Sequence, residues 1–220
     1  MIAITIDGPS GSGKSTVADV LAQKLGFNHL NTGALYRAVT YGCLQAGIRP
    51  DEDDKISNYI ANCGLNVKFV GGYQKVYLGD QDVTPYLRQN EISVQSPLYS
   101  VSPSVRYGLT DFSRKLSKKM NIILDGRDSG SFVLPDADYK FYLDASVTER
   151  AHRRQLELKA KCESVDLDTL VRQLTERDEF DKHKKIAPLV VPENAIIIDN
   201  THLDLEQTAE EMMKYIKIGK

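Results

Sequence analysis

The first sixteen residues carry glycines, a lysine and hydroxyl side chains in an order that could bind phosphate. Residues 8–15 read GPSGSGKS and fit the G-x-x-x-x-G-K-[ST] pattern of a phosphate-binding loop. Glycines let consecutive backbone N–H groups point at phosphate oxygens, and the start of the following helix adds a positive dipole end. Lys14 is then expected on the outer phosphates, and the Ser15 hydroxyl is expected to take a magnesium coordination site. The motif predicts binding of a nucleoside triphosphate.

Residues 30–37, LNTGALYR, supply a second candidate anion site. A small polar residue and Gly33 open a helix, and Arg37 follows one turn later. A helix N-terminus combined with an arginine suits a second anionic group. The alternative is a capped helix with a solvated arginine, and this stretch alone leaves both interpretations open.

Residues 124–130, LDGRDSG, directly follow a buried apolar run. Ligands of open α/β sheets bind at the carboxyl ends of the strands, where this stretch falls. Asp125 could anchor the magnesium shell or an orienting network, Arg127 could reach phosphate, and Asp128 could reach a base amino group. A structural turn with a local salt bridge is the alternative.

Two charged stretches near the C-terminus, ERAHRR and TERDEFDKHKK, have helical spacing. Their members recur three and four residues apart, so each set is expected on one helix face: Arg150, Arg153 and Arg154, then Arg177, Asp181 and Lys184. Charge runs are usually solvated faces. Phosphoryl transfer, however, depends on cations around the developing charge, and an arginine-rich helical hairpin suits a closing lid.

The elements that must position these residues alternate between strands and helices. Short apolar runs predict strands at 2–7, 121–124, 139–143 and 195–199, with a fainter fifth candidate at 27–30. Helical spacing predicts helices at 15–25, 32–46, 51–62, 102–119, 147–161, 167–181 and 205–216. Residues 65–69 and 76–78 flank a GGYQ turn and predict a hairpin within a small β-rich insert over 65–95. The alternation predicts an α/β fold on a parallel sheet.

Composition narrows the class of protein. The 220 residues are 41% hydrophobic and 26% charged, which is ordinary for a globular protein with a sizeable core. A net charge of −2 argues against a sequence-blind nucleic-acid coat. The three cysteines match no metal-ligand spacing, so reduced thiols are expected. No apolar run approaches the roughly 18 residues that span a bilayer, so a cytoplasmic protein with no membrane partner is expected.

Taken together, GPSGSGKST, TGALYR, LDGRDSGS, LPDADYKFYLDAS, ERAHRR, ERDEFD and APLV resemble the bacterial cytidylate kinase family from residue 2 to about residue 210. GRD followed by PDAD, and APL after an R-D-x-x-D helix, distinguish that family from adenylate, guanylate and shikimate kinases. The resemblance implies a three-layer P-loop NTPase fold with a parallel five-stranded core sheet. It also implies a core at 1–62, 98–150 and 186–220, a β-rich nucleoside-monophosphate-binding insert at about 63–97 and a short helical lid at about 151–185.

The resemblance further implies transfer of the γ-phosphoryl group of ATP to CMP or dCMP, with magnesium, by a monomer. The ATP phosphates would be held by Gly8, Pro9, Ser10, Gly11, Ser12, Gly13, Lys14, Ser15 and Thr16, with Lys14 central and Ser15 on the metal. Arg153 and Arg154 would belong to the lid over ATP.

The acceptor side follows from the same resemblance. Thr32 and Arg37 would lie at the sugar and phosphate of the acceptor, while Arg106 and Asp128 would read cytosine. The remaining residues implied at this site are Arg127 and Arg177 on phosphate or ribose, Asp181 on the sugar hydroxyls, Lys184 on the substrate, and Asp125 on the acceptor phosphate or the magnesium shell. Of all these, Lys14, Asp125, Arg127 and Arg177 are the expected catalytic residues.

Two positions depart from the family pattern. Lys184 stands where the family usually has arginine, so the charge remains but the bidentate fork is lost. Pro97 stands where a serine usually helps to read the base, and the neighbouring Ser96 is the candidate substitute. The alternatives are a kinase for UMP or shikimate and, from another class, a P-loop switch protein. The sequence shows neither an N-K-x-D-type guanine reader nor a glutamine placed to orient a hydrolytic water.

Overall fold

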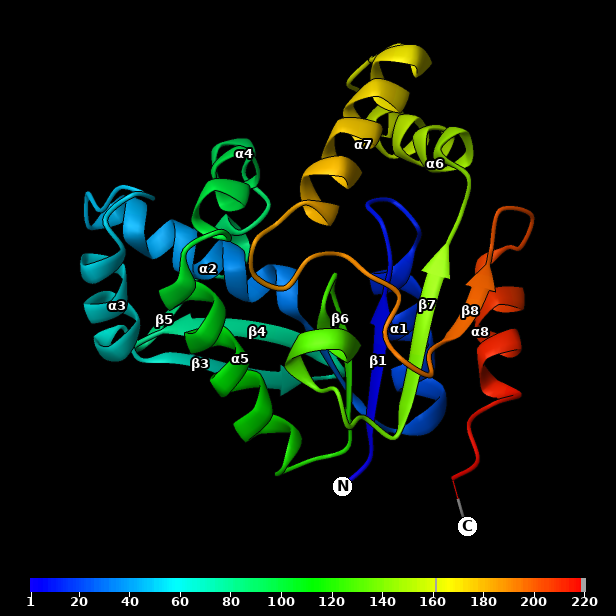
Figure 1. Ribbon diagram of the computed structural model, residues 1–220, viewed down its shortest axis with the longest axis horizontal. Helices are drawn as coiled ribbons and strands as arrows, with labels where there is room; N and C mark the ends of the chain where they lie inside the picture. The colour runs from blue at the N-terminus through cyan, green and yellow to red at the C-terminus, as the bar shows by residue number, and fades with distance from the viewer. Residues whose placement is uncertain (161, 219–220) are drawn as a thin grey trace.

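A parallel five-stranded sheet forms the centre of the computed structural model, which describes residues 1–160 and 162–218 (Figure 1). The order across the sheet is β2 (Asn28–Asn31), β6 (Ile122–Asp125), β1 (Ala3–Asp7), β7 (Tyr139–Asp144) and β8 (Ile196–Asp199). All four pairings between neighbours are parallel. The predicted strands all form, including the fainter one near residue 28, and the predicted α/β class is confirmed.

Helices cover both faces of this sheet and make it the middle of three layers (Figure 1). The helices α1 (Lys14–Leu25) and α8 (Leu205–Met213) lie on one face. The other face carries α2 (Thr32–Gln45) and α5 (Pro103–Ser117). Because strand side chains alternate between faces, Ile123 joins the core under α1, whereas its neighbour Leu124 joins the core under α2. Burial on both sides explains why the central strands β1 and β6 are nearly continuous apolar runs.

The insert contains a second, antiparallel sheet beside α3 (Asp53–Asn62). Its strands are β3 (Leu65–Val70), β4 (Tyr73–Leu78) and β5 (Gln81–Asp82), followed by the short turn η1 (Thr84–Tyr86) and the helix α4 (Asn90–Tyr99). The predicted hairpin is confirmed, but the prediction of β structure through residue 95 is wrong. Ile92 and Tyr99 on α4 are buried, and the Tyr99 hydroxyl donates to the Ile48 carbonyl at 2.6 Å. Packing against the core selects a helix there, which propensity alone does not indicate.

The predicted charged helical hairpin is formed by α6 (Val147–Lys159) and α7 (Leu167–Lys182), which stand above the sheet in Figure 1. The side chains of Ser146 and Asp166 accept backbone N–H groups and cap the two helices. A small apolar cluster of Ala151, Leu158 and Leu170 holds the helices together. Lys161, at the end of the predicted range 147–161, lies outside the described residues.

Two expectations from composition also bear on the fold. Cys43, Cys63 and Cys162 are free thiols, as their spacing predicts. Within residues 1–160 and 162–218, no helix is both long and apolar enough to cross a membrane. The cores on the two sheet faces therefore hold the domain together without disulfide cross-links between these three positions.

Candidate active site

The phosphate loop connects the end of β1 to the start of α1, and its glycines have a structural cause. Gly8 has φ +148°, and a Cβ at this position would lie 2.0 Å from the Leu143 carbonyl oxygen. Gly13, with φ +87°, adopts the left-handed conformation immediately before α1 begins. Only glycine adopts such backbone geometry at low cost. The loop therefore has the shape that its motif predicts.

The side chain of Lys14 folds back into the phosphate loop. Its side chain is buried, and Nζ donates to the Pro9 carbonyl at 2.5 Å and to Ser12 Oγ at 3.2 Å. Burial lowers the pKa of the Lys14 ammonium, and the charge of Arg127 lowers this pKa further. A bound anion would favour the charged form, which is the behaviour expected of a phosphate-binding lysine.

Ser15 lies beside the carboxylate of Asp125 at the end of β6. Its Oγ donates to Asp125 Oδ2 at 2.6 Å and accepts from Asn31 Nδ2 at 2.9 Å. Thr32 also lies here, but its Oγ1 donates to the Asp125 carbonyl at 2.7 Å. The structure therefore brings Ser15, Asp125 and Thr32 together at the end of β6.

His29 on β2 was missed by sequence reasoning and lies at the centre of a buried network. Nδ1 contacts Asp19 Oδ1 at 2.7 Å, and Nε2 contacts Asp125 Oδ1 at 2.8 Å. Burial disfavours the charged imidazolium, but the hydrogen bonds to the two carboxylates outweigh it and raise the pKa of His29 to about 9. His29 thus holds one oxygen of Asp125 while Ser15 donates to the other. No local signal in a four-residue strand indicates this pairing.

We expect this network to make the fold sensitive to alkaline pH. Because the pKa of His29 is higher in the folded than in the unfolded chain, its stabilisation is complete below about pH 6.5 and is lost as pH rises through about 9. The loss in unfolding free energy should be on the order of 3 kcal/mol. Urea unfolding in EDTA between pH 6 and pH 10 should show this loss in the native protein and not in His29→Gln. His183→Gln, at an exposed position, is the control. If the unfolding free energy of the native protein and that of His29→Gln changed by the same amount between pH 6 and pH 10, the expectation would be contradicted.

The acceptor side is organised around one buried carboxylate. Asp181 on α7 is fully buried, and its oxygens lie 2.9 Å from Arg127 Nε, 3.4 Å from Arg177 Nε and 2.6 Å from Lys184 Nζ. Burial opposes ionisation of Asp181, but the three cations outweigh it and lower its pKa to about 2. The excess of cations over carboxylates makes this cluster, which we call the acceptor cage, a site for an anion. The predicted residues Arg127, Arg177, Asp181 and Lys184 are all brought together in it, but α7 ends at Lys182, so Lys184 reaches Asp181 from the segment after the helix and not from the expected helix face.

Arg37 extends the cage from α2. Burial and the charge of Arg88 lower the pKa of Arg37, and Arg127 and Arg177 add to the effect. Within the described parts of the chain, its buried Nε has no hydrogen-bond acceptor. An unpaired buried donor among like charges is costly unless an anion binds it. Arg88, which precedes α4, was not singled out from the sequence, because the expected β structure there gave no reason to place it near Arg37.

The predicted base-reading pair is buried beside the cage. Arg106 on α5 donates to Asp128 Oδ2 at 2.8 Å, to the Tyr36 hydroxyl at 3.1 Å and to the Ser100 carbonyl at 2.8 Å. Burial raises the pKa of Asp128, and the charge of Arg106 opposes this rise. Pro97 lies within α4, and Ser100 O rather than a serine hydroxyl meets Arg106. Because these contacts fix the Arg106 guanidinium and the Asp128 carboxylate in place, the pair can distinguish bases that carry different hydrogen-bonding groups.

Arg150, Arg153 and Arg154 all lie on the helix α6, as their spacing predicts, but Arg153 and Arg154 make different contacts. Arg153 donates to Asn200 Oδ1 at 3.2 Å and to its carbonyl at 2.7 Å. Arg154 instead pairs with Glu157 at 2.9 Å and is 45% exposed. Arg154 lies one turn beyond Arg150 along α6, and its ion pair is with Glu157 of the same helix rather than with the phosphate loop.

A hollow of about 310 Å³ opens between Arg153 and the phosphate loop. It is lined by Gly13, Thr16, Val17, Glu149, Arg153, Asn200, Leu203, Asp204, Leu205 and Thr208. Asn200 follows β8 directly and donates to the Ser12 carbonyl at 3.0 Å. Sequence reasoning missed Asn200, although its position after a predicted strand is where ligands of such sheets bind.

The strand order and the phosphate loop after the first strand define a P-loop fold, and the cationic cage around Asp181 is a second candidate anion site. A solved structure of an uncharacterised protein from Eubacterium ventriosum covers 98% of both chains with a TM-score of 0.54. At 15% sequence identity, that likeness supports the shared fold alone.

Sequence comparison then gives the family. A family model described as cytidylate kinase matches residues 4–218. A cytidylate kinase from Caldicellulosiruptor saccharolyticus is 42% identical over 97% of this chain and 94% of its own length. Another, from Ligilactobacillus salivarius, is 40% identical over 98% of this chain and 96% of its own length. The chain belongs to the cytidylate kinase family, which the motifs had indicated.

Proposed function

We propose that this protein transfers the γ-phosphoryl group of ATP to CMP or dCMP and yields CDP or dCDP. The observation that carries the proposal is the position of Arg127. Its Nε pairs with Asp181 in the acceptor cage, and its charge acts on both Lys14 and Arg37. One guanidinium therefore lies within electrostatic reach of the phosphate loop and of the acceptor cage. Donor and acceptor phosphates bound at these two sites would adjoin.

This geometry supports direct in-line transfer between the two nucleotides. The reaction is catalysed mainly by positioning and by cations around the developing charge. Lys14 would hold the outer phosphates of ATP, while Arg127 and Arg177 would stabilise the group in transfer. No covalent intermediate is needed for this transfer, and Ser15, whose hydroxyl donates to Asp125 Oδ2, is assigned to magnesium in this proposal. Arg37 and Lys184 would hold the acceptor phosphate, and Asp181 its sugar hydroxyls.

The donor set near Ser15 fits a magnesium ion bound together with ATP. Mg²⁺ usually keeps several waters and takes one or two protein oxygens plus substrate phosphates. The Ser15 hydroxyl and the Asp125 carboxylate, 2.6 Å apart, are such oxygens. The described residues contain no cluster of three or more His, Cys, Asp or Glu side chains for an all-protein metal cage. The ion would neutralise phosphate charge, and His29 would keep Asp125 ionised and oriented.

The hollow beside Arg153 is the candidate site for the donor base, with Asn200 at its edge. In this assignment, 1–62, 98–150 and 186–220 form the core, about 63–97 the acceptor insert and about 151–185 the lid. A monomer is proposed as the working unit, as the family resemblance implies. Arg154, which is 45% exposed and paired with Glu157 in this arrangement, would have to leave that pair to join the lid over ATP.

A coupled ADP-release assay tests the proposal with ATP, magnesium and a panel of monophosphates. CMP and dCMP are expected to give the highest kcat/KM, with UMP, AMP and GMP well below them. A preference for UMP or for shikimate would replace the proposed acceptor. Phosphate release from ATP at full rate without any acceptor would instead favour a P-loop switch or hydrolase.

Asp128→Ala should mainly relax the preference for CMP over UMP. A site built to hydrogen-bond a substrate group discriminates strongly, because the wrong base leaves buried polar groups unpaired. Loss of the carboxylate should lower the ratio of kcat/KM values for CMP and UMP by roughly 10- to 100-fold. The ratio is independent of the folded fraction, which matters because Arg106 loses its buried partner. Asp111→Ala, exposed on α5 and paired with Lys115, should leave the ratio unchanged. An unchanged ratio in Asp128→Ala would remove this residue from base reading.

A further inference from the structure

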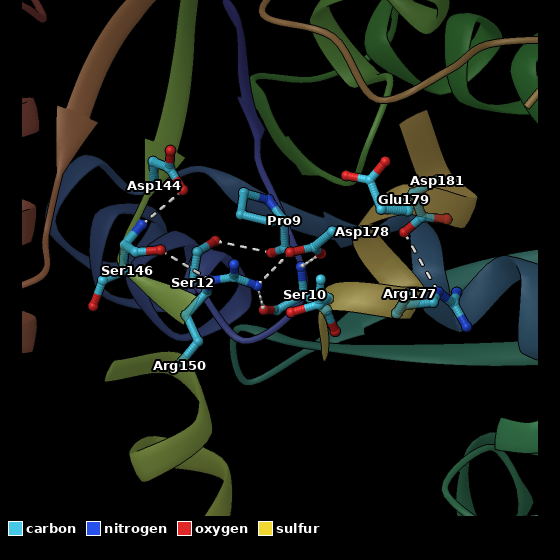
Figure 2. Close-up of polar contacts among 12 residues, drawn as sticks. Pro9, Ser10, Ser12, Asp144, Ser146, Arg150, Arg177, Asp178, Glu179 and Asp181 are labelled. Atoms are coloured by element: carbon cyan, nitrogen blue, oxygen red, sulfur yellow. Dashed lines mark hydrogen bonds and ion pairs between the residues drawn. The ribbon is translucent and has the colours of Figure 1, made fainter. Parts of the chain in front are cut away.

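The phosphate loop is attached to the helical lid through both backbone groups of Ser10 (Figure 2). The Ser10 N–H donates to Asp178 Oδ1 on α7 at 3.2 Å. The Ser10 carbonyl accepts from Arg150 NH1 on α6 at 2.9 Å. Arg150 and Asp178 themselves form an ion pair of 2.7 Å, and both side chains are at least nine-tenths buried. One loop residue therefore connects to both helices of the lid.

The helix α7 carries this attachment and the acceptor cage on neighbouring positions. Asp178 faces the phosphate loop, whereas Arg177 and Asp181 pair with each other on a separate side, as Figure 2 shows. Residues of one helix move as a unit, because its backbone hydrogen bonds fix their relative positions. A displacement of α7 from the loop would therefore also displace Arg177 and Asp181 from Arg127.

The loop conformation is the element that both nucleotide sites share. Phosphates bound to the loop would order its backbone, and the orientation of the Ser10 amide and carbonyl is part of that backbone. Docking of α7 requires the same orientation, because Asp178 and Arg150 bind those two groups. Two events that favour one conformation favour each other.

We propose that Asp178, together with Arg150, is a positioning element that couples occupancy of the phosphate loop to placement of Arg177 and Asp181. The inference rests on the proposed function, since it assumes ATP at the loop and CMP at the cage. Donor and acceptor then bind with positive cooperativity, and by linkage each tightens the other by the same factor. Asp178 contacts neither reacting phosphate in this account and acts through the loop and α7.

Calorimetric binding of CMP, with and without a non-hydrolysable ATP analogue and magnesium, measures this coupling. In the native protein the analogue should tighten CMP binding by about fivefold or more. In Asp178→Asn the factor should fall below about twofold, while the Kd of CMP alone stays within about threefold of the native value. Asp178→Glu, which keeps the charge, should recover part of the coupling. Glu179→Gln, on the exposed side of α7 and paired with Lys182, is the matched control and should keep the native factor.

The possible results separate the coupling from the proposed function. Equal weakening of CMP binding with and without the analogue would indicate a purely structural role and overturn the coupling. A native factor retained in Asp178→Asn would overturn it as well. If Asp178→Asn fails to fold by circular dichroism, Arg150→Lys decides, since it keeps the charge but loses the Nε–H that donates to the Ala145 carbonyl and holds Nη1 against Ser10 and Asp178. Absence of CMP binding to the native protein would instead refute the proposed acceptor.

Discussion

Lys14→Ala should lower kcat by about 10³-fold while leaving the fold intact. Removal of one preorganised donor to developing charge costs roughly 10²- to 10³-fold, and Lys14 is the cation placed inside the loop itself. Stability should not fall, because burial already lowers the pKa of this ammonium and its removal relieves that desolvation. Steady-state kinetics with saturating ATP and CMP, together with thermal unfolding, would measure the two effects.

Two further variants make the Lys14 result specific. Lys14→Met keeps the length of the side chain and should be as slow as Lys14→Ala if the charge is what matters. Lys24→Ala, at the other end of α1 and half-exposed in a pair with Glu206, should keep kcat within about twofold. Retention of more than a tenth of native kcat in Lys14→Ala would exclude this lysine from phosphate stabilisation.

The features that could be predicted from the sequence are those encoded by contiguous residues. The phosphate loop needs glycines, Lys14 and Ser15 within eight positions, so one short pattern specifies its shape and its chemistry. The central strands β1 and β6 were predictable because burial on both faces makes them nearly uninterrupted apolar runs. The helix α4 was not, since its formation depends on packing of Ile92 and Tyr99 against distant residues.

The pairings within the site lie beyond what local patterns determine. Asp181 meets Arg127 across 54 positions of sequence, and His29 meets Asp125 across 96. The three-and-four spacing of α6 correctly indicated a charged helix, but spacing does not tell which charge turns inward. Arg150 became the buried partner of Asp178, whereas Arg154 stayed at the surface. Only the placement of α7 above the phosphate loop decides this.

The α6–α7 hairpin and the acceptor cage differ in how their charges are paired, and the difference has a consequence for mutation. Arg150 and Asp178 form a one-to-one buried pair, so loss of either leaves an uncompensated charge at a cost of several kcal/mol. Asp181 instead serves three cations, so loss of one of them leaves the carboxylate compensated. Substitution of one cationic residue of the cage should therefore change the rate of the reaction without a large change in the stability of the fold.

Arg177→Ala uses this property and should lower kcat by about 10³-fold with little change in thermal stability. Arginines that stabilise charge in phosphoryl transfer contribute about 10³- to 10⁵-fold, and Arg177 is the most exposed cation of the cage. Its 3.4 Å contact with Asp181 is the longest of the three, which leaves the guanidinium available to phosphate. Steady-state kinetics and thermal unfolding would measure the loss of kcat against any change in Tm.

A control on the same helix separates the role of Arg177 from net charge. Arg172→Ala, exposed one turn earlier and bonded to Thr169, removes one charge from α7 and should keep kcat within about twofold. Arg177→Lys should recover only part of the native rate, because an ammonium keeps the charge but not the fork that suits phosphate. If Arg177→Ala retains more than a tenth of native kcat, or if Arg172→Ala is equally slow, the acceptor cage does not act on the group in transfer through this residue.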